Sequence, residues 1–400
     1  MSEIKRPIYL DYHATTPVDP LVLEAMLPYF TEYFGNPASR SHPFGWQASE
    51  AIEIARKQVS DLLNVSLHDL FFTSGSTEGL NMAIKGLAES LSHKGKHIIS
   101  ISTEHHAVLD PLHWLENKGY EITLLPVDVN GMVDNDQLKS SVRNDTIMVI
   151  VMWANNETGV IHDMKSIGQI CRDKGVALVS DGTQAVGKVK VDPHETGIDM
   201  LVLSAHKMYG PKGTGAIYMN TKEKKLKPEP LIHGGGHEMG FRSGTLNVPG
   251  IVGLGIASQI RQSSMHVDME RIKSLRDKFE NQLLSTVEHM SVNGSLDQRL
   301  YTVSNLKVAK VDSQAVMTKF RTKLAISSGS ACSSADPSPS HVLLAMGLSA
   351  EEAKGSFRIS LGAPTTSAEM NIAVKLLSEA IIEYRAESPV WQMFKQGIEI

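Results

Sequence analysis

A lysine that follows an apolar run is the first residue whose position points to chemistry. Lys207 lies in the stretch Ser204–Gly215 (SAHKMYGPKGTG), directly after the apolar residues 200–203. The glycines and the proline that follow argue against a helix, so we expect Lys207 at the end of a strand. An amine presented there can form a bond with the carbonyl group of a cofactor. A surface lysine in a turn is the alternative, and Lys207 alone does not decide between the two.

A glycine-containing turn between a predicted strand and a predicted helix could bind an anion. In the segment FTSGSTE, Gly75 permits a tight turn, and Ser76 and Thr77 then open the helix. Backbone amides and hydroxyls at a helix N-terminus favour a phosphate. An ordinary helix cap is the alternative, because Ser and Thr are preferred there without any ligand. The segment is not a Walker A loop, since no Gly-Lys-Ser/Thr follows.

An aspartate leaves another apolar strand in the segment VSDGTQ, residues 179–184. Ligands of open α/β sheets bind at the carboxyl ends of the strands. A carboxylate at Asp181 could therefore hold a cationic ring nitrogen, and Gln184 could hydrogen-bond a ring oxygen. A helix-capping aspartate is the alternative.

Histidines and asparagines follow two more predicted strands, in EHH at 104–106 and NNETG at 155–159. The imidazole of His105 could stack on an aromatic cofactor or move protons near neutral pH, although most lone histidines are structural. Adjacent histidines point in different directions and make a poor metal site. His233 and His237 are four residues apart, but three glycines between them break the helix that such a site needs. We therefore expect no metal.

A cysteine and an arginine near the C-terminus complete the set. Cys332 lies among small polar residues in SSGSACSS, where a thiol should be accessible, whereas Cys171 falls on the apolar side of a predicted helix. Cys332 is thus the better nucleophile, with an inert loop cysteine as the alternative. Arg358 falls in a short predicted strand, where its guanidinium needs either a structural carboxylate or the carboxylate of a substrate.

The elements that would position these residues form two groups. Apolar strands alternate with helical patterns from about residue 50 to 260, which predicts an α/β domain around a mostly parallel sheet. The predicted strands span residues 69–72, 97–102, 121–125, 146–153, 177–180, 200–204 and 215–219. Beyond Pro249 a long helix, two strands and further helices predict a small α+β domain. We therefore predict a large domain of residues 17–260 and a small domain of residues 1–16 and 261–400, which carries a cysteine loop at about 327–339.

Composition narrows the class of protein. The 400 residues are 42% hydrophobic and 21% charged, with a net charge of −5 and no long basic run, which argues against nucleic-acid binding. No apolar run is long enough for a bilayer, and the first residues do not resemble a secretory signal. Two cysteines give no disulfide framework. We expect a cytoplasmic protein.

Over nearly its whole length the sequence resembles the cysteine desulfurases of the NifS/IscS type, in the class V aminotransferase family. The resemblance is carried by the segments YLDYHATTP from Tyr9, GNPAS from Gly35, TSGSTE from Thr73, TEH from Thr103, NNETG from Asn155, SAHKMYGPKG from Ser204, HGGGHE from His233, RSGT from Arg242 and SSGSAC from Ser327. It implies the fold of the type I enzymes that depend on pyridoxal phosphate, with a homodimer and L-cysteine as substrate.

The resemblance also implies a role for each site residue. Lys207 would form a Schiff base with pyridoxal phosphate, and Cys332 would take sulfur from the bound cysteine, with His105 as acid and base. The phosphate would be bound by Ser76, Thr77, Ser204, His206 and, from the second subunit, Thr245. The ring would be held by Asp181, Gln184, Asn156 and His105, and the substrate carboxylate by Arg358 and Asn156.

The implied reaction converts L-cysteine to L-alanine and leaves a persulfide on Cys332, from which sulfur passes to an acceptor protein. The acceptor stays open between iron–sulfur cluster assembly and thiolation, because housekeeping members of the family dock a scaffold with a longer tail than the one that ends here at Ile400. A selenocysteine lyase or another class V aminotransferase or lyase is the alternative activity. A sulfur-delivery subunit with little turnover of its own is a further alternative.

Overall fold

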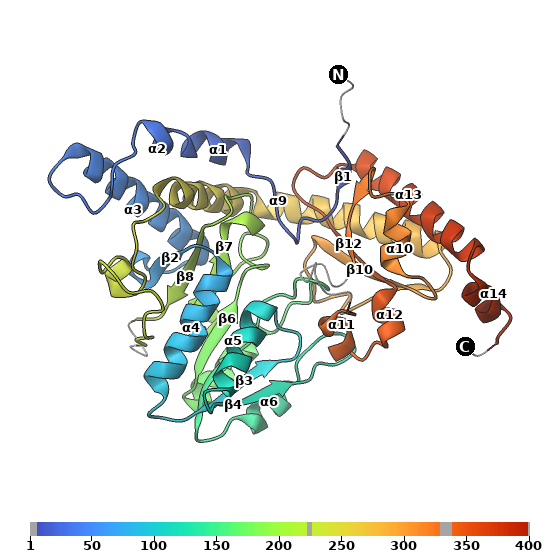
Figure 1. Cartoon of the computed structure of the whole chain (residues 1–400), viewed down its shortest axis with the longest axis horizontal. Helices are drawn as coiled ribbons and strands as arrows, with labels where there is room; N and C mark the ends of the chain where they lie inside the picture. The colour runs from blue at the N-terminus through green and yellow to red at the C-terminus, as the bar shows by residue number, and fades with distance from the viewer. Residues whose placement is uncertain (1–5, 222–225, 329–337, 399–400) are drawn as a thin grey trace.

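The computed structural model describes residues 6–221, 226–328 and 338–398. Within these ranges a large and a small β-sheet have helices packed on them, and two further short strands pair with each other (Figure 1). The large sheet has seven strands in the order β2-β8-β7-β6-β5-β3-β4, and only β8 runs antiparallel to its neighbours. These strands are β2 (Leu70–Thr73), β3 (His97–Ile101), β4 (Glu121–Leu125), β5 (Thr146–Ile150), β6 (Ala177–Asp181), β7 (Met200–Ser204) and β8 (Gly215–Met219).

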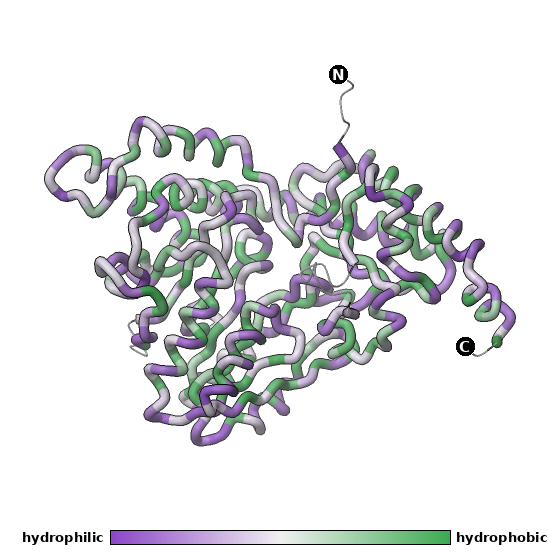
Figure 2. The backbone as a smooth tube through the Cα atoms, viewed as in Figure 1, coloured by the Kyte–Doolittle hydropathy of each residue, from purple (hydrophilic) through white to green (hydrophobic). Residues whose placement is uncertain are grey.

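Both faces of the large sheet are covered, which explains why its strands are apolar throughout. One core holds α4 (Ser76–Leu91) and α5 (His106–Glu116) against one face. The other core holds α3 (Pro43–Leu63), α7 (Met164–Lys174) and the start of α9 (Val248–Thr286). Figure 2 shows this as apolar residues along the central strands and hydrophilic residues in the turns.

The small sheet is antiparallel and has the order β12-β13-β10-β9. It packs on the later part of α9 and on α13 around a third core. Its parts and neighbours are β9 (Met290–Val292), β10 (Val303–Val308), α10 (Ser313–Thr318), β12 (Ser327–Ser328), α11 (His341–Ala345), α12 (Ala350–Lys354), β13 (Ser356–Ser360), α13 (Ser367–Ala386) and α14 (Pro389–Lys395).

The N-terminal segment joins the two sheets. β1 (Ile8–Tyr9) pairs with β11 (Leu324–Ala325), and the next residues run beside β13, where Ser360 N donates to Leu10 O at 2.8 Å. The segment then reaches the end of β7, where Thr16 N donates to His206 O at 3.0 Å. Residues distant in the sequence therefore meet where the sheets face each other.

Most predicted elements are present, and several short ones were missed. The predicted strand at residues 146–153 ends at Ile150, although the chain stays beside β6 through Trp153 N, which donates to Asp181 O at 2.9 Å. The short elements α1 (Pro20–Met26), α2 (Pro28–Thr31), α6 (Asn135–Ser141), α8 (Pro193–Thr196), β1, β9, β11, β12 and α14 were not predicted. They have too few residues for hydrophobic periodicity to show.

The α/β fold with a mostly parallel sheet, as predicted, is what the structure shows. The predicted boundary between two domains at residue 260 falls inside α9, and the division into domains stays a prediction. Within the described ranges, no helix combines the length and the apolar character needed to cross a bilayer.

Candidate active site

A cavity of about 550 Å³ opens where the carboxyl ends of the large-sheet strands face the N-terminal segment. Its walls come from the turns after β2, β3, β5, β6 and β7 and from residues 13–15. Nine residues predicted from the sequence line this one cavity, namely Ser76, Thr77, His105, Asn156, Asp181, Gln184, Ser204, His206 and Lys207. They converge because the carboxyl ends of parallel strands meet at one edge of a sheet.

Lys207 ends the single turn of 3₁₀ helix that follows β7. Its Nζ donates to the backbone carbonyl of His13 at 2.6 Å and to that of Ala14 at 2.8 Å. The amine therefore lies at the cavity wall, held by the N-terminal segment. This is the placement expected for a lysine that bonds to a cofactor carbonyl.

One end of the cavity is built for an anion. Gly75 has φ +147°, a conformation that favours glycine, and it starts the 16-residue helix α4 at Ser76. The helix N-terminus points backbone N–H groups and its positive dipole end into the cavity. Ser76 Oγ is 2.6 Å from Thr183 Oγ1, and a Cβ added at Gly75 would lie 3.8 Å from Ser204 Oγ, so small hydroxyl side chains surround the turn.

The carboxylate of Glu78 also borders the cavity but is paired elsewhere. It accepts hydrogen bonds from Arg242 Nε at 2.8 Å and from the backbone N–H of Ser74 at 3.0 Å. Although burial opposes ionisation, these bonds lower the pKa of Glu78. Its charge is thereby offset by Arg242 and does not oppose an anion at the helix end.

Two histidines in the cavity are kept neutral at neutral pH. Burial, with Lys207 adding to it, lowers the pKa of His206 to about 4, and its Nδ1 lies 3.1 Å from Thr15 Oγ1. Burial also lowers the pKa of His105. The N–H of Ala107 donates to His105 Nδ1 at 3.0 Å, so the neutral ring carries its proton on Nε2.

Asp181 ends β6 and is 6% exposed. One carboxylate oxygen accepts the N–H of Thr183 at 2.9 Å. Gln184 donates through Nε2 to the carbonyl of His13 at 3.0 Å. The side chain of Asn156, 9% exposed in total, has an Oδ1 without a hydrogen-bond partner among the described residues. Buried acceptors left in this way at a cavity wall are suited to a ligand.

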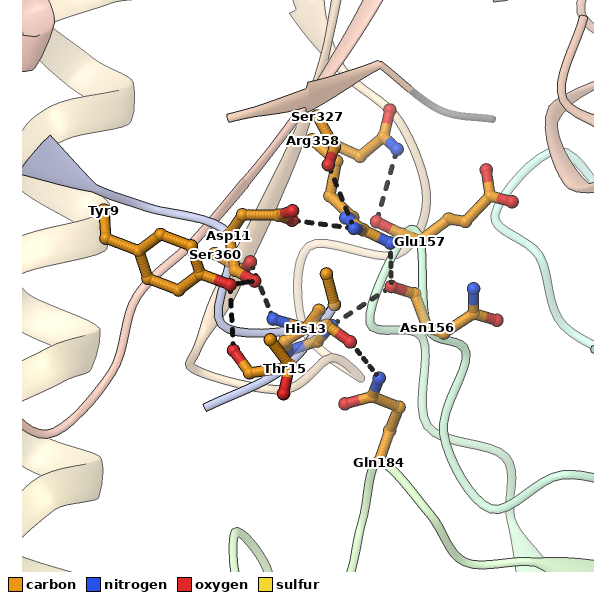
Figure 3. A network of polar contacts seen from close by, with 12 residues as sticks. Tyr9, Asp11, His13, Thr15, Asn156, Glu157, Gln184, Ser327, Arg358 and Ser360 are labelled. Atoms are coloured by element: carbon orange, nitrogen blue, oxygen red, sulfur yellow. Dashed lines mark hydrogen bonds and ion pairs between the residues drawn. The ribbon is translucent and has the colours of Figure 1, made fainter. Parts of the chain in front are cut away.

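Arg358 lies behind the cavity and does not line it. Its guanidinium, 1% exposed, donates to Asp11 Oδ1 at 2.8 Å, to Ser327 Oγ at 3.3 Å and to the backbone carbonyl of Asn156 at 3.3 Å (Figure 3). The structural ion pair weighed as one alternative for Arg358 is thus present. Its predicted contact with a substrate carboxylate stays a prediction.

Of the remaining predicted residues, Thr245 is not brought to the cavity of this chain. Thr245 is exposed and is absent from the cavity wall. Cys332 lies outside the described residues.

Sequence reasoning missed the role of His13 in this region. Its ring is buried, and Nδ1 lies 3.1 Å from the carbonyl of Asn156 (Figure 3). Its Nε2 lies 2.9 Å from Thr302 Oγ1. A carbonyl only accepts, so Nδ1 carries the proton, and burial lowers the pKa of His13 well below its usual value. The segment YLDYHATTP around it was a signal, but nothing in that segment assigned a task to His13.

These features fit pyridoxal phosphate. The N-terminus of α4 suits its phosphate, the carboxylate of Asp181 its ring nitrogen, and the amine of Lys207 its aldehyde. The cavity volume of about 550 Å³ is within the range of cofactor sites.

Comparison with known proteins identifies the family. The model of the family "Aminotransferase class-V" matches residues 8–372. "Cysteine desulfurase IscS" of Shewanella frigidimarina is 48% identical over 399 residues, covering 99% of this chain and 98% of that protein. The protein of the same name from Neisseria meningitidis is 47% identical over 397 residues, with the same coverage.

Solved structures agree. "NIFS-LIKE PROTEIN" is 33% identical with a TM-score of 0.88, covering 94% of this chain and 100% of that one. "SspA in complex with cysteine" is 35% identical with a TM-score of 0.78, covering 88% of this chain and 98% of that one. The chain therefore belongs to the class-V aminotransferase family. Within it, the chain is a pyridoxal-phosphate-dependent cysteine desulfurase of the IscS type, which confirms the predicted family, fold class, activity and cofactor.

A buried carboxyl next to the cavity yields a prediction for stability. Glu157 follows Asn156 and accepts a hydrogen bond from Ser340 Oγ at 2.5 Å. Burial raises the pKa of Glu157 from 4.5 to about 7. The stability that its protonated form contributes is complete below pH 4.5 and is lost as the pH rises through about 7. Glu157→Gln keeps an oxygen for Ser340 but does not ionise. Its free energy of unfolding should therefore rise relative to that of the wild type, by up to about 3 kcal/mol, between those two pH values.

Urea unfolding at about pH 5 and about pH 7.5 measures this difference. Glu195→Gln, at an exposed carboxylate paired with Lys190, is the matched control and should track the wild type. Parallel pH profiles for Glu157→Gln and the wild type would contradict the assignment.

Proposed function

We propose that this cysteine desulfurase acts on L-cysteine in the cavity described above, with Lys207 as the residue that holds and releases the cofactor. The convergence of Lys207, Asp181 and the N-terminus of α4 on one cavity carries the proposal. The similar protein SspA was solved in complex with cysteine, which supports L-cysteine as the substrate. When bound, pyridoxal phosphate withdraws electrons from the amino acid attached to it.

Lys207 is proposed to move the proton on the substrate α-carbon. When it does not hold the cofactor, its Nζ would be held by the carbonyls of His13 and Ala14, to which it donates at 2.6 and 2.8 Å. An amine held in the cavity in this way would need little reorganisation to accept and return a proton.

Asp181 is proposed to keep the ring nitrogen protonated, because a buried carboxylate favours a cation beside it. His105 would stack on the ring and exchange protons through Nε2, since Nδ1 is occupied by the N–H of Ala107. Ser76, Thr77, Ser204 and His206 would hold the phosphate. Gln184 and Asn156 would contact the ring oxygen.

Asn156 and Arg358 are proposed to bind the substrate carboxylate. The guanidinium of Arg358 lies next to the backbone of Asn156, because it donates to the backbone carbonyl of Asn156 at 3.3 Å. A guanidinium group can donate hydrogen bonds to Asp11 and to a second carboxylate at the same time. The ion pair with Asp11 at 2.8 Å then sets the orientation of the guanidinium group.

Cys332 is proposed as the sulfur acceptor. Its thiolate attacks the sulfur of the bound cysteine, so that an S–S bond forms on the protein and the C–S bond of the substrate breaks. The electron pair of that C–S bond stays with the substrate carbon, which is protonated and leaves as L-alanine. The persulfide on Cys332 then passes its outer sulfur to an acceptor protein. We further propose that this transfer takes place in the cytoplasm.

Replacing Cys332 tests this role. Cys332→Ser is expected to retain the visible absorbance of the bound cofactor and to lose alanine formation by at least about 100-fold, because the attacking thiolate is gone. Alanine is quantified after addition of L-cysteine, with no keto acid present. Cys171→Ser, at the buried cysteine of α7, is the matched control and should retain turnover. Sulfide release by Cys332→Ser at the wild-type rate would refute the assignment.

The homodimer is also a proposal, and an exposed apolar surface supports it. We define the α1–α3 patch as the exposed apolar side chains of α1, α2, the following turn and the start of α3, namely Leu21, Leu23, Leu27, Phe30, Tyr33, Phe34, Phe44 and Trp46. Phe34 is 64% exposed and Phe30 58% exposed. A concentration of exposed apolar side chains of this kind is typical of protein interfaces. Thr245, exposed in this chain, is then proposed to contact the phosphate bound by the second copy.

Charges placed in the α1–α3 patch should weaken the dimer. The double variant Phe30→Asp/Phe34→Asp is expected to raise the dimer dissociation constant by at least about 100-fold, because two carboxylates would be buried without partners. Sedimentation velocity measures the change. Val129→Asp, at a 73% exposed residue between β4 and α6, is the matched control. A double variant that sediments as the wild type would show that the patch is not the interface.

A further inference from the structure

A lysine behind the cavity takes no part in the mechanism above. Lys188 lies four residues after Gln184, in the turns that follow β6, and is 7% exposed. Its Nζ donates to the backbone carbonyl of Gln184 at 3.0 Å and to Gln184 Oε1 at 3.1 Å. Among the described residues no carboxylate forms an ion pair with it. Burying an ammonium group without a counter-ion costs free energy, so a functional role would explain why Lys188 is buried.

The ammonium of Lys188 fixes which way the Gln184 amide points. An ammonium can only donate, so the side-chain atom that faces Lys188 must be the oxygen. The carbonyl of His13 can only accept, so the atom that faces it at 3.0 Å must be Nε2. Since Gln184 lines the cavity, these two neighbours leave the second N–H of Nε2 as a donor there.

The carbonyl of His13 connects this amide to Lys207. It accepts from Gln184 Nε2 at 3.0 Å and from Lys207 Nζ at 2.6 Å. Figure 3 shows Gln184 reaching this carbonyl from the large sheet while the His13 ring points toward Asn156. A continuous chain of hydrogen bonds therefore runs from Lys188 through Gln184 and His13 to Lys207.

The charged and titratable neighbours of Lys188 are mostly cationic or neutral. The groups that face it from the surrounding elements are Lys207, Arg261, His13, His206, Tyr12, Tyr209 and Tyr301. Arg261 is itself paired with Asp268 at 2.6 Å. Burial first, then repulsion from Lys207 and Arg261, lowers the pKa of Lys188 to about 7. Its charge is therefore sensitive to a second cation at Lys207.

We propose that Lys188 is a positioning residue of the cofactor site. It fixes the side-chain amide of Gln184 and, through the carbonyl of His13, the amine of Lys207. Its positive charge also disfavours a second positive charge at Lys207. The proposal rests on the proposed bond between Lys207 and the cofactor. It assigns Lys188 no contact with the substrate. The effect should therefore appear in the protonation of the cofactor–lysine linkage, which colours the enzyme, independently of turnover.

The test is a pH titration of the visible absorbance of the loaded enzyme. In Lys188→Met the midpoint should rise by about one pH unit, because a positive charge that opposed protonation has been removed. Lys190→Met is the matched control: it removes a lysine two residues away that is 71% exposed and paired with Glu195, and its midpoint should equal that of the wild type. Lys188→Arg keeps the charge and should keep the midpoint at or below that of the wild type.

The outcomes separate this inference from the proposed function. If the wild type titrates and the midpoint of Lys188→Met is the same, the proposed role of Lys188 is wrong, and the proposed cofactor site is not affected. A wild type that takes up no pyridoxal phosphate overturns the proposed function itself. If circular dichroism shows that Lys188→Met is unfolded, Lys188→Gln replaces it, since its amide can still donate to Gln184 Oε1 without a charge. An unchanged midpoint in Lys188→Gln overturns the inference in the same way.

Discussion

The N-terminal segment from Tyr9 to Thr16 is the connection on which the site depends. It leaves the small sheet beside β13, crosses to the large sheet and ends against the residues that follow β7. Its backbone carbonyls receive the amine of Lys207, and the ring of His13 binds Asn156 and Thr302. One extended segment thus holds the reactive amine and ties both sheets to the same point.

Buried charge is the second constraint on the site. Buried groups there are either kept neutral or paired with an opposite charge. His13 and His206 are neutral because burial opposes their protonation. Arg358 is compensated by Asp11, and burial raises the pKa of Glu104 well above its usual range. The cavity can therefore accept an anionic phosphate at α4 and a cationic ring nitrogen at Asp181 without many competing ions.

Much of the site could be predicted from the sequence because parallel strands bring their carboxyl ends to one edge. That rule places Ser76, Asp181 and Lys207 together even though they are far apart in the chain. The tasks of His13 and Lys188 could not be predicted, since each depends on contacts whose geometry no local pattern encodes. The ion pair between Arg358 and Asp11 joins residues 347 positions apart, and short elements such as α1 lack the periodicity that identifies helices.

Peptide mass spectrometry can show whether Lys207 in this cavity bonds to pyridoxal phosphate. The protein loaded with the cofactor is reduced with borohydride, which makes the bond between amine and cofactor permanent, and is then digested. A phosphopyridoxyl group is expected on the peptide that contains Lys207, at close to one group per chain. An unmodified Lys207, or modification at Lys188 or another lysine instead, would contradict this expectation.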